Sequence, residues 1–150
     1  MWNPKNYRLH LDSWGLGLFV MIMLPNFIWL AIPAPRDILR SGTLTPTLDL
    51  VSSIVQIFMV CFLCLFVNRQ SHPTVEQKAM LGICFSVTLY LFGWIFYYIG
   101  FTGPMVILVL SLSPCLSFLF YTWSRKNGPA FVAAALFAVL HTLRSILNFL

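Results

Sequence analysis

Apolar residues dominate five long stretches of the chain, and polar or proline-rich connections separate these stretches. They cover approximately residues 13–32, 48–67, 79–101, 105–123 and 129–150. About 20 mostly apolar residues are enough for a helix to cross the hydrocarbon core of a bilayer. The pattern therefore predicts an all-α, polytopic integral membrane protein, in which a bundle of five transmembrane helices forms a single domain over residues 1–150.

The connections indicate how neighbouring helices are joined. The sequence GFTGP at 100–104 is short, so we expect the third and fourth spans to form an antiparallel hairpin. The connection before the second span is rich in proline, and Thr45 and Pro46 stand where that helix should begin. Gly128 and Pro129 are typical of one helix ending and the next beginning.

Composition excludes a soluble globular domain. Of the 150 residues, 59% are hydrophobic and 9% are charged, whereas soluble domains carry about 25% charged residues. The formal net charge is +5, but the basic residues lie singly or in pairs between the apolar stretches. A nucleic-acid-binding surface needs them gathered on one patch, so we expect no nucleic-acid partner.

The basic residues instead predict the orientation in the membrane. With five spans, one side carries six of them: Lys5, Arg8, Arg69, Lys78, Arg125 and Lys126. The other side carries three: Arg36, Arg40 and Arg144. Cytoplasmic loops carry an excess of Lys and Arg, so we expect a multi-pass protein of the cell membrane with its N-terminus in the cytoplasm and its C-terminus outside.

Aromatic residues support the same orientation, because Trp and Tyr prefer the two membrane interfaces. The inner interface would hold Trp14, Tyr121 and Trp123, and the outer one Trp29, Trp94, Tyr97 and Tyr98.

The last span carries a possible surface for helix association. Ala130, Ala134 and Ala138 recur at every fourth position, and small residues let helices approach closely in lipid. Besides the lipid bilayer, a second copy of the chain or another membrane protein could bind through this alanine ridge.

The first span is interrupted by a proline and an amide. Pro25 frees the carbonyl of Met21, and the neighbouring amide of Asn26 could donate to that carbonyl or to a neighbouring helix. An unpaired amide in hydrocarbon would cost several kcal/mol, so we expect Asn26 to face protein or a water-filled cavity.

Other polar residues lie at a similar depth in the outer half of the spans. At about 1.5 Å per residue, Asn26, Gln56 and His141 lie roughly 10–14 Å from the outer ends of their helices. Arg144 shares a helical face with His141, Ser113 lies in the outer half of its span, and Asp49 lies nearer the outer surface. The sequence predicts an outward-facing ligand-binding cavity, with these candidate residues: Asn26, Gln56, His141, Arg144, Asp49 and Ser113.

Four of these candidates also have a structural explanation. Arg144 could extend to the headgroups from the end of its helix, and His141 could be a neutral core residue bonded to a carbonyl. Asp49 could stabilise the first turn of the second span through the helix dipole. Asn26 could serve only to fix the bundle.

The sequence contains none of the common catalytic, phosphate-binding or metal-binding motifs that we considered. It contains no H-E-x-x-H, G-x-S-x-G or glycine-rich phosphate loop, and the C-x-x-C of Cys61 and Cys64 has no second ligand pair. We therefore predict no catalytic residue, no metal and no cofactor, and favour a protein that is not an enzyme.

Three functions fit this sequence. The first is binding or transport of a small ligand through the outward cavity. The second is an accessory or sensory membrane subunit acting through helix association. The third, less favoured, is an intramembrane enzyme built on His141 with Asp49 or Ser113.

Overall fold

The structure is a computed structural model that describes residues 6–42, 44–71 and 74–150. Its helices are α1 (Ser13–Ala31), α2 (Pro46–Leu65), α3 (Gln77–Ile99), α4 (Pro104–Ser124) and α5 (Gly128–Phe149), with a short 3₁₀ helix η2 (Ile38–Arg40). All five long helices are long and apolar enough to cross a membrane. The five predicted spans are thus present as helices, and their bounds differ from the predicted ones by no more than two residues.

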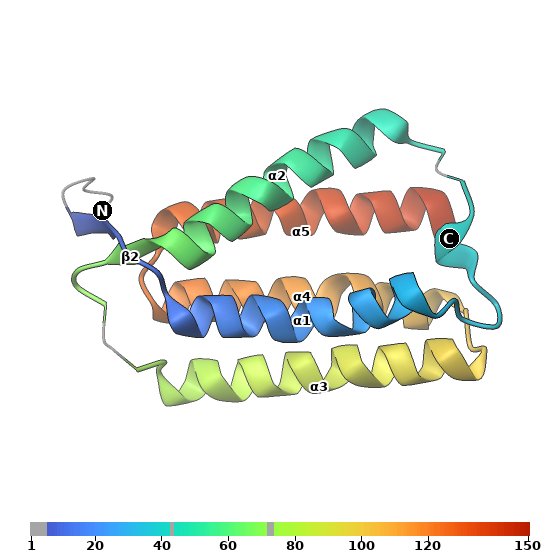
Figure 1. Cartoon of the computed structure of the whole chain (residues 1–150), viewed down its shortest axis with the longest axis horizontal. Coiled ribbons are helices and arrows are strands. Elements are labelled where there is room, and N and C mark those ends of the chain that lie inside the picture. Colours follow the sequence, from blue (N-terminus) through green and yellow to red (C-terminus); the bar gives the residue numbers. More distant parts are fainter. Residues whose placement is uncertain (1–5, 43, 72–73) are drawn as a thin grey trace.

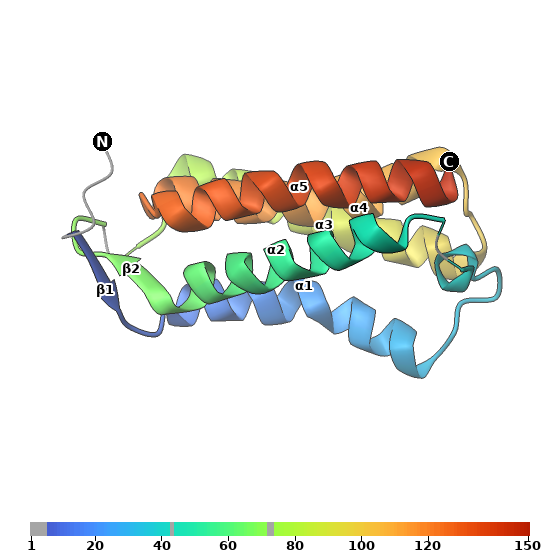
Figure 2. The ribbon, with the colours of Figure 1, turned by 90° about the horizontal axis from the view of Figure 1, so that it is seen from above.

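The helices run alternately up and down the bundle, so the start of α1 and the end of α5 lie at opposite ends of the molecule (Figure 1). The α3–α4 pair forms the expected hairpin, and α5 packs between α4 and α2. Viewed at right angles, the C-terminal half of α1 diverges from α5 toward the end that carries η2 (Figure 2).

Side-chain caps and prolines set where the helices begin. Asp12 caps α1, because its carboxylate accepts the backbone N–H of Gly15 at 3.4 Å. Asn127 caps α5 in the same way, through the N–H of Ala130 at 3.3 Å. Proline occupies the first turn of α2, α4 and α5, where its missing N–H needs no intrahelical partner.

A two-stranded antiparallel sheet at the N-terminal end of the bundle was not predicted. Strands β1 (Tyr7–Leu9) and β2 (Phe66–Asn68) pair Arg8 with Val67. The second span was expected to continue to Val67, but α2 ends at Leu65 because the following residues pair with β1 instead. This β-ribbon joins the start of α1 to the end of α2.

Small residues allow the helices to pack closely. A Cβ on Gly15 would lie 2.8 Å from the carbonyl oxygen of Leu63, so α1 and α2 touch at this glycine. Ala130 and Ala134 of the alanine ridge have no exposed surface, and Ala138 is half-buried. The ridge is therefore largely occupied by packing within the chain, and binding of a partner there stays a prediction.

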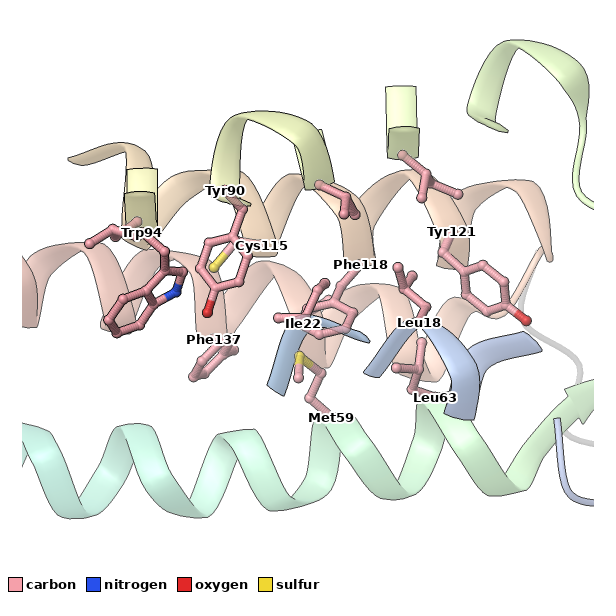
Figure 3. Packing of buried hydrophobic residues seen from close by; sticks show 14 of the residues in the cluster. Leu18, Ile22, Met59, Leu63, Tyr90, Trp94, Cys115, Phe118, Tyr121 and Phe137 are labelled. Carbon is pink, nitrogen blue, oxygen red and sulfur yellow. The ribbon is translucent and has the colours of Figure 1, made fainter. Parts of the chain in front are cut away.

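The buried core runs along the bundle axis (Figure 3). Leu18, Leu63 and Tyr121 fill the half near the β-ribbon, while Tyr90 and Trp94 lie in the other half. The outward faces of the helices are apolar as well; Ile57 is 63% exposed. Such a surface suits contact with lipid rather than water.

Candidate functional site

A cavity of about 270 Å³ lies inside the bundle, and residues from all five long helices line it. Four of the six predicted site residues are among them: Asn26, Gln56, His141 and Arg144. They come from α1, α2 and α5, and the C-terminal half of α1 diverges from the other two helices toward the end of the bundle that carries the C-terminus (Figures 1 and 2). These residues were grouped by their estimated depth in the predicted spans, and the fold places them around one cavity. Their binding of a ligand stays a prediction.

Asn26 holds α1 against α3 at the edge of this cavity. Its amide donates to the backbone carbonyl of Ile22 at 3.1 Å and to the hydroxyl of Tyr90 at 2.6 Å. The expected bond to a neighbouring helix is therefore present, while the carbonyl that Asn26 reaches within α1 is that of Ile22 rather than Met21. Asn26 has a structural role, and Tyr90 keeps its own hydroxyl proton for another acceptor.

Arg144 and Asp49 form an ion pair between α5 and α2. The guanidinium Nε of Arg144 donates to Asp49 Oδ1. Asp49 itself does not line the cavity, and it occupies the first turn of α2 as its position after Thr45 predicted. Because Asp49 balances the positive charge, Arg144, which lines the cavity, does not by itself require an anionic ligand.

Serines from two helices meet on the α4–α5 side of the cavity. The hydroxyls of Ser111 and Ser145 are 2.7 Å apart, and Ser145 also donates to the carbonyl of His141 at 2.9 Å. Ser113, a predicted site residue, is buried but is not among the residues that line the cavity, whereas Ser111 lines it. Binding of a ligand by Ser113 stays a prediction. Two residues along a helix differ by roughly 200° in direction, so depth alone could not decide between them.

Three polar side chains of the cavity have no hydrogen-bond partner in the part of the chain that the structure describes. They are the amide of Gln56, the imidazole of His141 and the indole Nε1 of Trp94. Gln56 and His141 are partly buried, whereas Trp94 is buried, with only 6% of the residue exposed. His141 stacks on Phe137 with ring centroids 4.9 Å apart, a contact that leaves its nitrogens unused. Polar groups at such depth in an apolar bundle are costly unless water or a ligand binds them.

Tyr90 and Trp94 were missed as cavity residues. Trp94 and Tyr97 were assigned to the outer aromatic belt, but they are buried inside the bundle, and Tyr90 and Trp94 line the cavity (Figure 3). Tyr90, Trp94 and Tyr97 are spaced i, i+4 and i+7, which places them on one helical face. That spacing could have indicated an inward-facing aromatic stripe.

Asp37 organises the loop between α1 and α2 at the C-terminal end of the bundle. Trp29 Nε1 donates to both carboxylate oxygens at 3.0 and 2.9 Å, and the Tyr97 hydroxyl donates to Oδ1 at 2.9 Å. Arg40 forms an ion pair with Oδ2 at 2.9 Å. The loop therefore holds the C-terminal ends of α1 and α3 together beside the cavity, and Leu39 of this loop lines it.

The described residues contain no group of three His, Cys, Asp or Glu side chains placed to bind a metal ion. Cys64 and Cys115 are buried, whereas Cys61 and Cys84 are exposed on the outside of the bundle. The arrangement around the cavity can donate and accept hydrogen bonds, and it offers one balanced ion pair at its rim.

The fold is thus a bundle of five apolar helices around a cavity that both apolar and polar side chains line. No protein-family model matches this chain, and no curated protein or solved structure shows significant similarity to it.

Proposed function

We propose that this chain is an integral membrane protein that binds a small polar ligand in the cavity between its helices, as the binding step of transport. The observation that carries the proposal is the set of three cavity side chains without partners among the described residues, Gln56, Trp94 and His141. The binding of polar contents there would offset the cost of placing these groups at membrane depth.

The chemistry of the lining suggests the class of ligand. Trp94 N–H and the Tyr90 hydroxyl can donate, and Gln56 can donate or accept. Arg144 is balanced by Asp49, so a net negative charge on the ligand is not required. A small molecule with several oxygen acceptors fits this lining, and the volume of about 270 Å³ limits its size.

The geometry also favours access from the C-terminal end. Leu18, Leu63 and Tyr121 pack the half of the bundle near the β-ribbon (Figure 3), while the ion pair of Arg144 lies at the other end of the cavity. In the proposed orientation, with the N-terminus in the cytoplasm, the cavity opens to the outside. Pro25 of α1 and Pro114 of α4 interrupt two of the surrounding helices, and such interrupted helices build sites at membrane depth.

Labelling with a charged, membrane-impermeant thiol reagent tests access to the cavity. We expect Gln56→Cys to react when a methanethiosulfonate carrying a quaternary ammonium is added outside intact cells. The control is Ile57→Cys, which is adjacent but faces lipid and should not react. The unsubstituted protein gives the background of its own four cysteines.

Equal labelling of Gln56→Cys and Ile57→Cys, or no labelling of either, would contradict a hydrated cavity. Labelling of Gln56→Cys only after the membrane is permeabilised would mean that the cavity opens to the cytoplasm. That outcome would overturn the proposed direction of access.

A further inference from the structure

A second pocket lies at the opposite end of the bundle, beside the β-ribbon. Its volume is about 340 Å³, and it lies between the β-ribbon, the start of α1 and the end of α4. We name it the N-terminal basic pocket after its charged lining residues: Arg8, His10, Asp12, Arg69 and Arg125. Three arginines against one aspartate leave an excess of positive charge.

The arginines of this pocket differ in their partners. Arg125 and Asp12 are both buried and form an ion pair at 3.4 Å. Arg8 and Arg69 are exposed, and within residues 6–42, 44–71 and 74–150 neither side chain forms an ion pair or a hydrogen bond. The excess positive charge therefore belongs to Arg8 and Arg69.

The β-ribbon and the turn after it bring these two arginines to the same pocket. Arg8 is directly opposite Val67, and the N–H of Arg69 continues the ladder by donating to Asn6 O at 2.8 Å. Arg69 lies in the turn directly after β2, two residues beyond Val67, and it lines the N-terminal basic pocket together with Arg8. Two like charges that line one pocket repel each other, and an anion bound between them would relieve this repulsion.

An apolar groove of about 420 Å³ runs along α1 and α3 from the same end of the bundle. Gly17, Met21, Ile83 and Val87 are among its lining residues. Trp14 lines both this groove and the N-terminal basic pocket, so the two spaces share a border. Trp14 is 63% exposed, as expected of an indole at the headgroup level of a membrane.

We propose that the two spaces together bind one anionic phospholipid. Its phosphate lies between Arg8 and Arg69, its glycerol backbone passes Trp14, and one acyl chain lies along the groove between α1 and α3. The basic pocket adjoins an apolar groove that runs along the membrane helices α1 and α3. A lipid could fill both spaces, whereas a free phosphate ion could fill only the basic pocket. Basic pockets at the cytoplasmic ends of membrane helices recognise such headgroups.

Native mass spectrometry of the detergent-purified full chain tests this proposal. The probes are phosphatidylglycerol and phosphatidylcholine with identical acyl chains. We expect retention of phosphatidylglycerol over phosphatidylcholine, and a loss of affinity of about fivefold in Arg8→Gln and again in Arg69→Gln. Lys78→Gln is the matched control, because Lys78 is an exposed cation at the same end that lines neither space.

Filling the groove tests the position of the acyl chain. A Cβ on Gly17 would meet no atom within 4 Å, so Gly17→Phe should occupy the groove without disturbing the packing of α1. We expect it to weaken the binding of phosphatidylglycerol while leaving the arginines in place. Arg69→Lys, which keeps the charge, should retain most of the binding.

Three results would overturn the proposal. The first is equal retention of the two lipids by the unsubstituted chain. The second is a loss of affinity in Lys78→Gln as large as in the arginine variants, which would indicate general charge attraction. The third is displacement of phosphatidylglycerol by inorganic phosphate together with unchanged binding in Gly17→Phe, which would make the pocket a site for free phosphate.

Discussion

The bond between Asn26 and Tyr90 joins the interrupted helix α1 to α3, and its removal should weaken the bundle by a calculable amount. Asn26→Leu removes both the 2.6 Å bond to the Tyr90 hydroxyl and the 3.1 Å bond to the carbonyl of Ile22. Tyr90→Phe removes only the interhelical bond. The two substitutions therefore share one interaction and differ in the other.

Interhelical polar contacts in membranes contribute about 0.6 kcal/mol on average and up to about 1.7 kcal/mol. The short distance and the burial of Tyr90 place this bond in the upper part of that range. We expect each substitution to lower the free energy of unfolding by about 1 kcal/mol. The double variant should lose less than the sum, with a coupling free energy of about 1 kcal/mol.

Equilibrium unfolding of the four proteins in mixed micelles, followed by far-UV circular dichroism, measures this coupling. Tyr98→Phe is the matched control, because the Tyr98 hydroxyl donates to the carbonyl of Ile32 and not to Asn26. Its effect should add to that of Asn26→Leu. If the Asn26 and Tyr90 effects also add, the bond does not stabilise the bundle and the structural role assigned to Asn26 is refuted.

Three further predictions concern the ends of the bundle. In a double-mutant cycle of Asp49→Asn and Arg144→Gln we expect a coupling of about 1 kcal/mol in free energy of unfolding, because both side chains are partly exposed; zero coupling would make Arg144 an interfacial anchor. Asp37→Ala leaves the donors of Trp29 and Tyr97 without their acceptor. Because the backbone N–H of Leu39 donates to the same Tyr97 hydroxyl, its hydrogen exchange should accelerate about tenfold; unchanged exchange would show that Asp37 does not hold the loop. A phosphatase fused to the C-terminus should be active and a fluorescent protein fused there dark, and the reverse result would overturn the proposed orientation.

Hydrophobic patterning predicted the five helices because each apolar stretch is long and its ends carry proline or glycine. The cost of an unpaired amide in hydrocarbon also predicted that Asn26 would contact a neighbouring helix. In both cases one contribution to the free energy dominates: the transfer of apolar side chains into lipid for the helices, and the cost of an unpaired amide for Asn26. The β-ribbon was missed because strands of three residues have no pattern of their own and form only through a partner distant in the sequence.

The positions of residues that suit two environments, a membrane interface or the interior of the bundle, were predicted less accurately. Trp94 has an apolar ring and a polar N–H, so its sequence position fits an interface as well as a cavity wall. Ser113 and Ser111 have nearly the same depth, and only the rotation of α4 selects Ser111. That rotation depends on contacts with α3 and α5, which the sequence of α4 alone does not determine.

The central claim is that the cavity holds polar contents, and the indole N–H of Trp94 reports on them most directly. It is a buried donor that lacks a partner within the described part of the chain. In ¹⁵N-labelled protein in lipid nanodiscs, with Trp94→Phe to assign the resonance, NMR detects contact between this N–H and water. Our account predicts a cross-peak to water, or a shifted resonance protected by a co-purified ligand. A Trp94 indole with neither water contact nor a bound ligand would mean a dry cavity and would contradict the account.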